Sequence, residues 1–110
     1  MKLLESEARW LSDFLNEVEK RFPGTVEEVS IYGSKAREDS KPESDLDVLL
    51  IVNSDSGGLK SLIRDAGYLL AADGNAVPSI VAYTRDEWDN RKESGSGFRA
   101  SVEQDAVRVL

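Results

Sequence analysis

Apolar residues recur every three or four positions from residue 3 to residue 22, and this spacing predicts an amphipathic helix that ends at Pro23-Gly24. The same spacing predicts a second helix over residues 59–70. After a Gly- and Ser-rich break at 94–97, it predicts a last helix from Phe98 to the C-terminus. Helices of this kind need a shared apolar surface on which to pack.

Three short segments carry a strand pattern: residues 26–32, 45–52 and 77–83. The aliphatic run of the second predicts a central strand covered on both faces, and Pro78 pushes the third toward an edge. With one helical turn within 34–44 and a short helix after the third strand, the order is α-β-α-β-α-β-α-α. This order predicts an α/β (α+β) fold, a small mixed sheet of three or four strands flanked by helices, which we expect mainly on one side.

Several aromatic and acidic residues have structural interpretations. We expect Trp88 and Phe98 to pack the C-terminal helices on the sheet, and Trp10 to pack at the flank of the first helix. Thr84 to Glu87 fits a capping box for the short helix that contains Trp88. Four clustered acids are interpreted as solvated: Glu5, Glu7, Glu27 and Glu28.

The amino-acid composition excludes several kinds of functional site, but it says less about the fold. The 110 residues suffice for one domain, taken as residues 1–110, with 14 basic and 21 acidic side chains and a net charge of −7. This acidity argues against a nucleic-acid-binding surface. Cysteine and histidine are both absent, which excludes disulfides, Cys or His zinc sites and histidine-based catalysis. No targeting segment or membrane-spanning run is visible, so we expect a cytoplasmic protein without membrane partners.

Gly33 and Ser34 end the first strand and open a helical turn. Glycine lets a ligand approach the backbone closely, and the amides at the start of a helix attract an anion. The Ser34 hydroxyl and the Arg37 guanidinium, one turn further on, would add donors for phosphate oxygens. This segment therefore predicts an anion-binding cradle.

Asp45 and Asp47 stand two residues apart at the start of the central strand, so their side chains point to the same side. Two carboxylates without His or Cys suit Mg²⁺ or Mn²⁺. Either half alone is usually structural, a turn or a solvated acid pair. The two halves together say more. A complex of a metal ion with a nucleoside triphosphate requires a carboxylate pair beside an anion cradle.

The segment YGSKAREDSKPESDLDVLLIV resembles the signature of the minimal nucleotidyltransferases of the polymerase β-type superfamily, Gly-Ser, ten residues, Asp-x-Asp. The neighbouring helices and the third strand also fit that family in order and length, so the resemblance covers nearly the whole chain. It implies ATP as substrate and Mg²⁺ as cofactor. By the same resemblance, the nucleotide would be bound by Gly33, Ser34, Arg37 and Ser44, and the catalytic metal by Asp45 and Asp47.

One position departs from the family pattern. Active members carry a third carboxylate on the following strand, whereas residues 76–83 contain no acid and Ser79 stands near the expected place. Asp73, Asp86 and Glu87 lie just outside this strand and are weak substitutes. Loss of a ligand to the second metal ion would weaken catalysis while nucleotide binding survives.

The resemblance further implies a separate partner, because such domains are usually encoded beside an all-helical HEPN protein, a ribonuclease-type toxin. There they act as antitoxins, some by transferring AMP to a tyrosine of the toxin, and the acidic charge would suit a basic RNA-cleaving surface. The alternative is a catalytically degenerate module that binds nucleotide and neutralises its partner by contact alone. A transferase acting on RNA or antibiotics is disfavoured by the acidic charge and the lack of a substrate domain.

Overall fold

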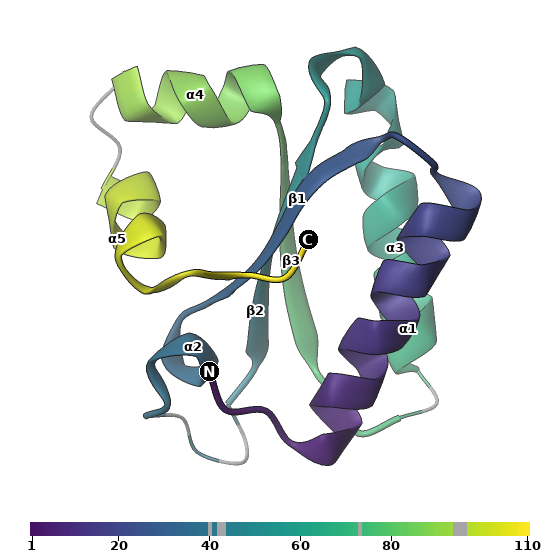
Figure 1. Ribbon diagram of the computed structural model, residues 1–110, viewed down its shortest axis with the longest axis vertical. Coiled ribbons are helices and arrows are strands. Elements are labelled where there is room, and N and C mark those ends of the chain that lie inside the picture. The colour runs from purple at the N-terminus through teal and green to yellow at the C-terminus, as the bar shows by residue number, and fades with distance from the viewer. Residues whose placement is uncertain (40, 42–43, 73, 94–96) are drawn as a thin grey trace.

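Four strands build one mixed sheet in the order β3-β2-β1-β4 (Figure 1). β1 (Val26–Tyr32) runs antiparallel to β2 (Leu46–Val52), and β2 runs parallel to β3 (Pro78–Thr84). β4 (Val107–Arg108) pairs antiparallel with the other edge of β1. The three strands predicted from the sequence are therefore confirmed to within one residue at each end, and β3 lies at an edge as Pro78 indicated.

The computed structural model describes residues 1–39, 41, 44–72, 74–93 and 97–110. Most of the predicted break at 94–97 lies outside this part of the chain, as does Asp73. Within it, no helix is both long enough and apolar enough to cross a membrane.

Helices cover both faces of the sheet. α1 (Glu5–Arg21) and α3 (Lys60–Ala71) lie on one face, and α4 (Arg85–Glu93) and α5 (Gly97–Asp105) lie on the other (Figure 1). A single turn, α2 (Ser34–Arg37), follows β1, and a 3-10 helix, η1 (Ser54–Leu59), connects β2 to α3. The mixed sheet flanked by helices is confirmed, whereas the expectation that the helices lie mainly on one side is wrong.

The aliphatic run of β2 explains the two helical layers, because alternate side chains of a strand point to opposite faces. Leu50 belongs to the core under α1 and α3, together with Phe14. Leu49 belongs to a second, smaller core with Trp88 of α4 and Val102 of α5. The prediction that this strand is covered on both faces is confirmed, and so is the packing of the C-terminal helices through their aromatic residues.

The chain after α5 does not continue as the helix that the apolar spacing predicted. α5 ends at Asp105, and the next residues pair as β4 with the edge of β1. Val107 and Val109 then pack against the core under α1, while Ala106 packs against the second core. The apolar spacing from Phe98 onward suits this helix-then-strand path as well as one helix, so periodicity alone could not separate them.

Two local predictions are confirmed. Oγ1 of Thr84 accepts a hydrogen bond from the N–H of Glu87 (3.1 Å), and Oε1 of Glu87 accepts one from the N–H of Thr84 (2.8 Å), which is the capping box of α4. Trp10 is buried against Phe14 with its ring stacked, and its Nε1–H donates to the carbonyl of Gly67 (2.8 Å). The indole therefore ties α1 to α3.

The acidic residues interpreted as solvated divide into different cases. Glu5 is exposed and Glu27 is paired at the surface with Arg85 (2.9 Å). Glu28 is half-buried between Arg85 (3.5 Å) and Arg108 (3.7 Å). The ion pairs of Glu28 join β1 to α4 and β4, so its solvated interpretation is wrong.

Candidate functional site

The end of β1 and the start of β2 bring most of the predicted site residues together. Tyr32, the last residue of β1, pairs with Asp47 in the antiparallel register, and Ser79 of β3 pairs with Asp47 from the other side. Asp47 precedes Leu49 by two residues, so its side chain points to the sheet face that carries α4 and α5. Because Asp47 is the second residue of β2, its carboxylate lies on that face at the start of this strand. Figure 1 shows that β2 starts at the end of the sheet next to α2.

Gly33 gives the backbone a very close approach to this carboxylate. Its φ of 74° lies in the left-handed region that favours glycine. A Cβ built at this position would also overlap Oδ2 of Asp47. Glycine therefore allows the chain to turn from β1 into α2 while it remains in contact with Asp47.

A buried ion pair holds α2 against α1. Lys35 and Glu7 are each almost fully buried, and Nζ of Lys35 lies 3.1 Å from Oε2 of Glu7. The other carboxylate oxygen of Glu7 accepts the N–H of Leu4 (2.8 Å), and the carbonyl of Lys35 accepts the N–H of Lys2 (3.1 Å). The interpretation of Glu7 as solvated is wrong, because Lys35 offers the carboxylate a partner inside the protein.

Arg37 follows Ser34 by three residues, which places both side chains on one side of the α2 turn. Its Nε and Nη1 donate to Oδ2 of Asp39 and Oδ2 of Asp105, each at 3.1 Å. These hydrogen bonds, the one to Asp39 first, raise the pKa of the guanidinium. The predicted phosphate-binding cation is thus held between an acid of its own loop and the last residue of α5.

The electrostatics of Asp47 favour a bound cation. Burial raises the pKa of this carboxyl, the neighbouring Asp45 raises it further, and Arg37 lowers it. Burial, followed by the charge of Asp47, also raises the pKa of Tyr32 to about 12. A half-buried carboxylate beside a second carboxylate is costly to ionise, and a divalent cation would relieve that cost.

The two residues just before β2 are engaged differently. Oγ of Ser44 accepts the N–H of Lys41 (3.1 Å), and the N–H of Ser44 donates to the carbonyl of Lys41 (2.9 Å). Asp45 is exposed. The Ser44 hydroxyl is therefore engaged by the Lys41 amide, whereas the Asp45 carboxylate is exposed to solvent.

The donor set fits one hard divalent cation. Asp45, just before β2, and Asp47, its second residue, supply carboxylate oxygens, which are the ligand type that Mg²⁺ and Mn²⁺ prefer. Among the residues that the structure describes, no group of three or more acids could hold a metal ion. Ser79 stands beside Asp47 in the register, where a third carboxylate would complete the set.

Two of the substitutes proposed for that third carboxylate, Asp86 and Glu87, do not reach this place. Asp86 and Glu87 lie at the start of α4, beyond the far end of β3, since Thr84 pairs with Val52 and not with Asp47. Glu87 is also engaged by Lys60 (2.7 Å), which together with the Thr84 N–H lowers the pKa of its carboxyl. Neither acid can share a cation with Asp47.

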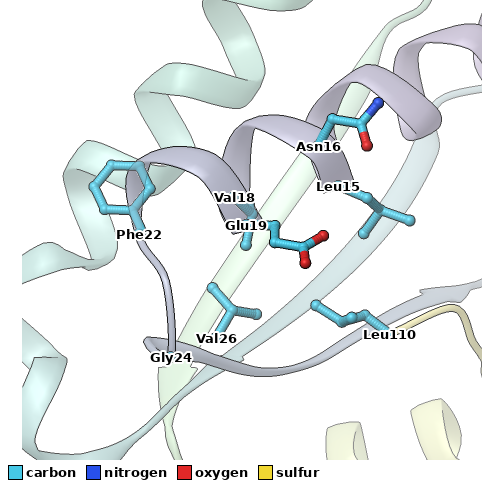
Figure 2. A pocket seen from close by; sticks show the side chains of 8 residues that line it. All are labelled: Leu15, Asn16, Val18, Glu19, Phe22, Gly24, Val26 and Leu110. Carbon is cyan, nitrogen blue, oxygen red and sulfur yellow. The ribbon is translucent and has the colours of Figure 1, made fainter.

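A cavity of about 380 Å³ lies elsewhere (Figure 2). It is lined by the end of α1, the start of β1 and the C-terminal residue, with Leu15, Phe22, Val26 and Leu110 among its side chains. β1 leads from Val26 at this cavity to Tyr32 at the carboxylate pair, so the two features sit at opposite ends of one strand. The cavity is therefore separate from the candidate site.

Sequence reasoning missed the residues that hold the site in place. Lys35 directly follows Ser34, yet nothing in the pattern marks it as buried. Glu7 could have been found, because an acid three residues after Leu4 suits the first turn of a helix. Nothing in the sequence indicated a role for Asp105 at the site, because 68 positions separate it from its partner Arg37.

Three comparisons with known proteins agree with this geometry. A family model described as a nucleotidyltransferase domain matches residues 11–102. A "putative protein adenylyltransferase" of Methanocaldococcus jannaschii is 28% identical over 102 residues, which cover 93% of this chain and 97% of the relative. The crystal structure of a "putative nucleotidyltransferase" from Sulfolobus solfataricus has the same fold, with a TM-score of 0.56, 24% identity, and coverage of 94% of this chain and 82% of that one.

The family match extends over most of the chain and includes the Gly-Ser turn and both aspartates. Together with the Methanocaldococcus relative, it supports a function of the nucleotidyl-transfer type. The chain belongs to the nucleotidyltransferase domain family.

Proposed function

We propose that this protein transfers the nucleoside monophosphate part of a nucleoside triphosphate, with ATP as the donor, to a hydroxyl group of a separate protein. The acceptor we propose is an all-helical HEPN-type toxin, which AMP transfer would inactivate. The name of the Methanocaldococcus relative, a protein adenylyltransferase, supports a protein acceptor. The resemblance of the Gly-Ser, Asp-x-Asp segment to the minimal nucleotidyltransferases supports the antitoxin role.

One observation carries the proposal: the contact between the backbone of Gly33 and the carboxylate of Asp47. It brings the turn that would bind phosphates to the carboxylates that would bind a cation. Ser34 and Arg37 extend from the same turn, so phosphate oxygens bound there would lie beside the cation. A phosphate–metal complex needs both parts side by side.

The residues of this chain would bind and orient rather than react. Asp45 and Asp47 would hold Mg²⁺, and Ser34 and Arg37 would hold the phosphate chain. A bound Mg²⁺ would supply neutralisation of the charge that develops on the phosphate oxygens. The acceptor oxygen would attack the α-phosphorus, the bond from that phosphorus to the bridging oxygen would break, and pyrophosphate would leave with the electron pair. The hydroxyl proton would pass to solvent.

The test uses the protein together with the HEPN-type protein encoded beside it. After incubation with ATP and Mg²⁺, we expect intact mass spectrometry of the partner to show the added mass of AMP. The variant with both Asp45→Asn and Asp47→Asn should give none. Asp65→Asn, an exposed aspartate on α3, is the matched control and should retain transfer. Transfer by the double variant at the wild-type level would refute the proposal.

A second candidate function is favoured by Ser79. This residue stands beside Asp47 where the family's third carboxylate would share the metal ions. Without this third carboxylate, the chain would bind Mg-ATP and neutralise its partner by contact alone. In that case the partner should gain no AMP, while its ribonuclease activity should fall on mixing even without ATP.

A further inference from the structure

Helix α5 contacts the candidate nucleotide site at both of its ends. The ring of Phe98, near its start, lies edge-on against the ring of Tyr32, with 5.9 Å between the centroids. Asp105, its last residue, accepts the hydrogen bond from Nη1 of Arg37. Nothing in the proposed reaction uses this carboxylate.

Asp105 accepts a hydrogen bond from Nη1 of Arg37, a donor for which a bound phosphate would compete. A guanidinium has five N–H donors in a fixed plane, and here Nε faces Asp39 while Nη1 faces Asp105. Arg37 ends the α2 turn that Gly33 opens, and Gly33 lies against Oδ2 of Asp47, so the guanidinium extends from the same turn that contacts this carboxylate. Phosphates bound to a cation at Asp47 would therefore reach Arg37 where Asp105 already accepts a hydrogen bond from Nη1.

The charges around Arg37 set the Asp105 carboxylate and a bound phosphate in competition for the guanidinium. Arg37 contributes one positive charge, and Asp39 and Asp105 together contribute two negative charges. A phosphate oxygen that bound to Arg37 would lie close to these two carboxylates, and their repulsion would favour the withdrawal of one of them. Asp39 lies two residues from Arg37 on the same loop, whereas Asp105 comes from another element, at the end of α5 and just before the two-residue strand β4.

We propose that Asp105 is a positioning residue that holds Arg37 in the absence of nucleotide, and that binding of a metal–triphosphate displaces it and loosens the end of α5. This inference rests on the proposed function of the Gly33–Asp47 site. The chain leads from Asp105 through Ala106 directly into β4, so release of the carboxylate weakens the pairing of β4 with β1. By linkage, the factor by which nucleotide binding weakens the Arg37–Asp105 contact equals the factor by which loss of that contact strengthens nucleotide binding.

The first test measures binding by calorimetry, with ATP and with inorganic tripolyphosphate as probes, each in the presence of Mg²⁺. Arg37 and Asp105 are 45% and 21% exposed, so loss of their ion pair should tighten binding by about 1.5- to 5-fold in Asp105→Asn. Glu103→Gln is the matched control, because it removes one charge from the same helix where Glu103 pairs with Arg99 (2.8 Å). Its affinity should equal that of the wild type, as should that of Asp105→Glu.

The second test follows hydrogen exchange of the amides at residues 106–110. Mg-ATP should speed their exchange in the wild type, and in Asp105→Asn the exchange should be fast before any nucleotide is added. Equal or weaker binding by Asp105→Asn, or exchange that nucleotide does not change, would overturn the inference while the proposed function stands. If the wild type binds neither probe, both fail together.

Discussion

The buried ion pair between Glu7 and Lys35 allows a sharp test of what positions the site. Replacing Lys35 by Met keeps the length of the side chain but leaves the carboxylate of Glu7 buried without its counter-charge. Removing one partner of a buried pair typically costs about 3–5 kcal/mol, because the remaining charge has lost both water and its partner. We therefore expect the Lys35→Met variant to lose that much of its free energy of unfolding.

The magnitude converts into a melting temperature. Unfolding entropy of about 2 cal/mol/K per residue means that 1 kcal/mol shifts the melting temperature of a chain of this size by about 4 °C. The Lys35→Met variant should then melt about 12–20 °C below the wild type. Thermal and urea unfolding followed by circular dichroism would measure the loss.

The double variant Glu7→Gln with Lys35→Met distinguishes the effect of the unpaired buried charge from the effect of the changed side-chain shape. The amide oxygen that Glu7→Gln introduces can still accept the N–H of Leu4, so the start of α1 keeps its hydrogen bond. Because no buried charge remains, we expect the double variant to be more stable than Lys35→Met alone, with a non-additivity above about 1 kcal/mol.

The exposed pair Glu5–Arg9 on the same helix is the matched control. Its atoms lie 3.4 Å apart, with side chains 91% and 72% exposed. Glu5→Gln or Arg9→Met should each change the free energy of unfolding by less than about 1 kcal/mol. If Lys35→Met costs no more than these controls, or if the effects at Glu7 and Lys35 simply add, then the pair does not hold α2 and the reasoning is refuted.

Three further predictions concern the site itself. Because the folded state raises the pKa of Asp47, stability is gained as the pH falls through that pKa; with metal chelated, Asp47→Asn should therefore melt above the wild type at pH 7, and the gap should shrink toward pH 4. Gly33→Ala should lower the free energy of unfolding by about 1–3 kcal/mol, from positive φ and overlap with Asp47, and a Gly24→Ala control should lose less because its Cβ would meet open space. Mg-ATP should raise the melting temperature of the wild type, and a shift of equal size with both Asp45→Asn and Asp47→Asn would contradict the assigned metal ligands.

The sequence allowed prediction of the parts of the fold that local pattern controls. The run from Leu46 to Val52 is aliphatic at every position except Asp47, which indicated both a central strand and the place of the carboxylate. The contact of Gly33 with Asp47 follows from a strand end meeting the start of its neighbour. Such features depend on residues close in sequence or on adjacent strands, so alternation and turn chemistry are enough to find them.

The features that could not be predicted depend on pairs of residues far apart in the chain. Lysine is a residue type that is usually exposed, and Lys35 is buried because Glu7 lies across from it as its partner. β4 has two residues, too few for a strand pattern, and it forms because the edge of β1 is open to it. Its pairing with β1 brings the end of α5, with Asp105, to Arg37.

The alternation of β2 connects stability with function in this fold. Leu49 and Ile51 face α4 and α5 and bury the second core, and Asp47 is the next residue on the same face. Asp47 therefore lies at the end of the second core, where its side chain remains half-buried. This partial burial, followed by the charge of Asp45, raises the pKa of Asp47, while the exposed part of the side chain leaves it reachable by a cation. The layer that stabilises the sheet thus sets the electrostatic properties of the candidate site, and α5, which ends in Asp105, is the part of that layer able to respond to a ligand.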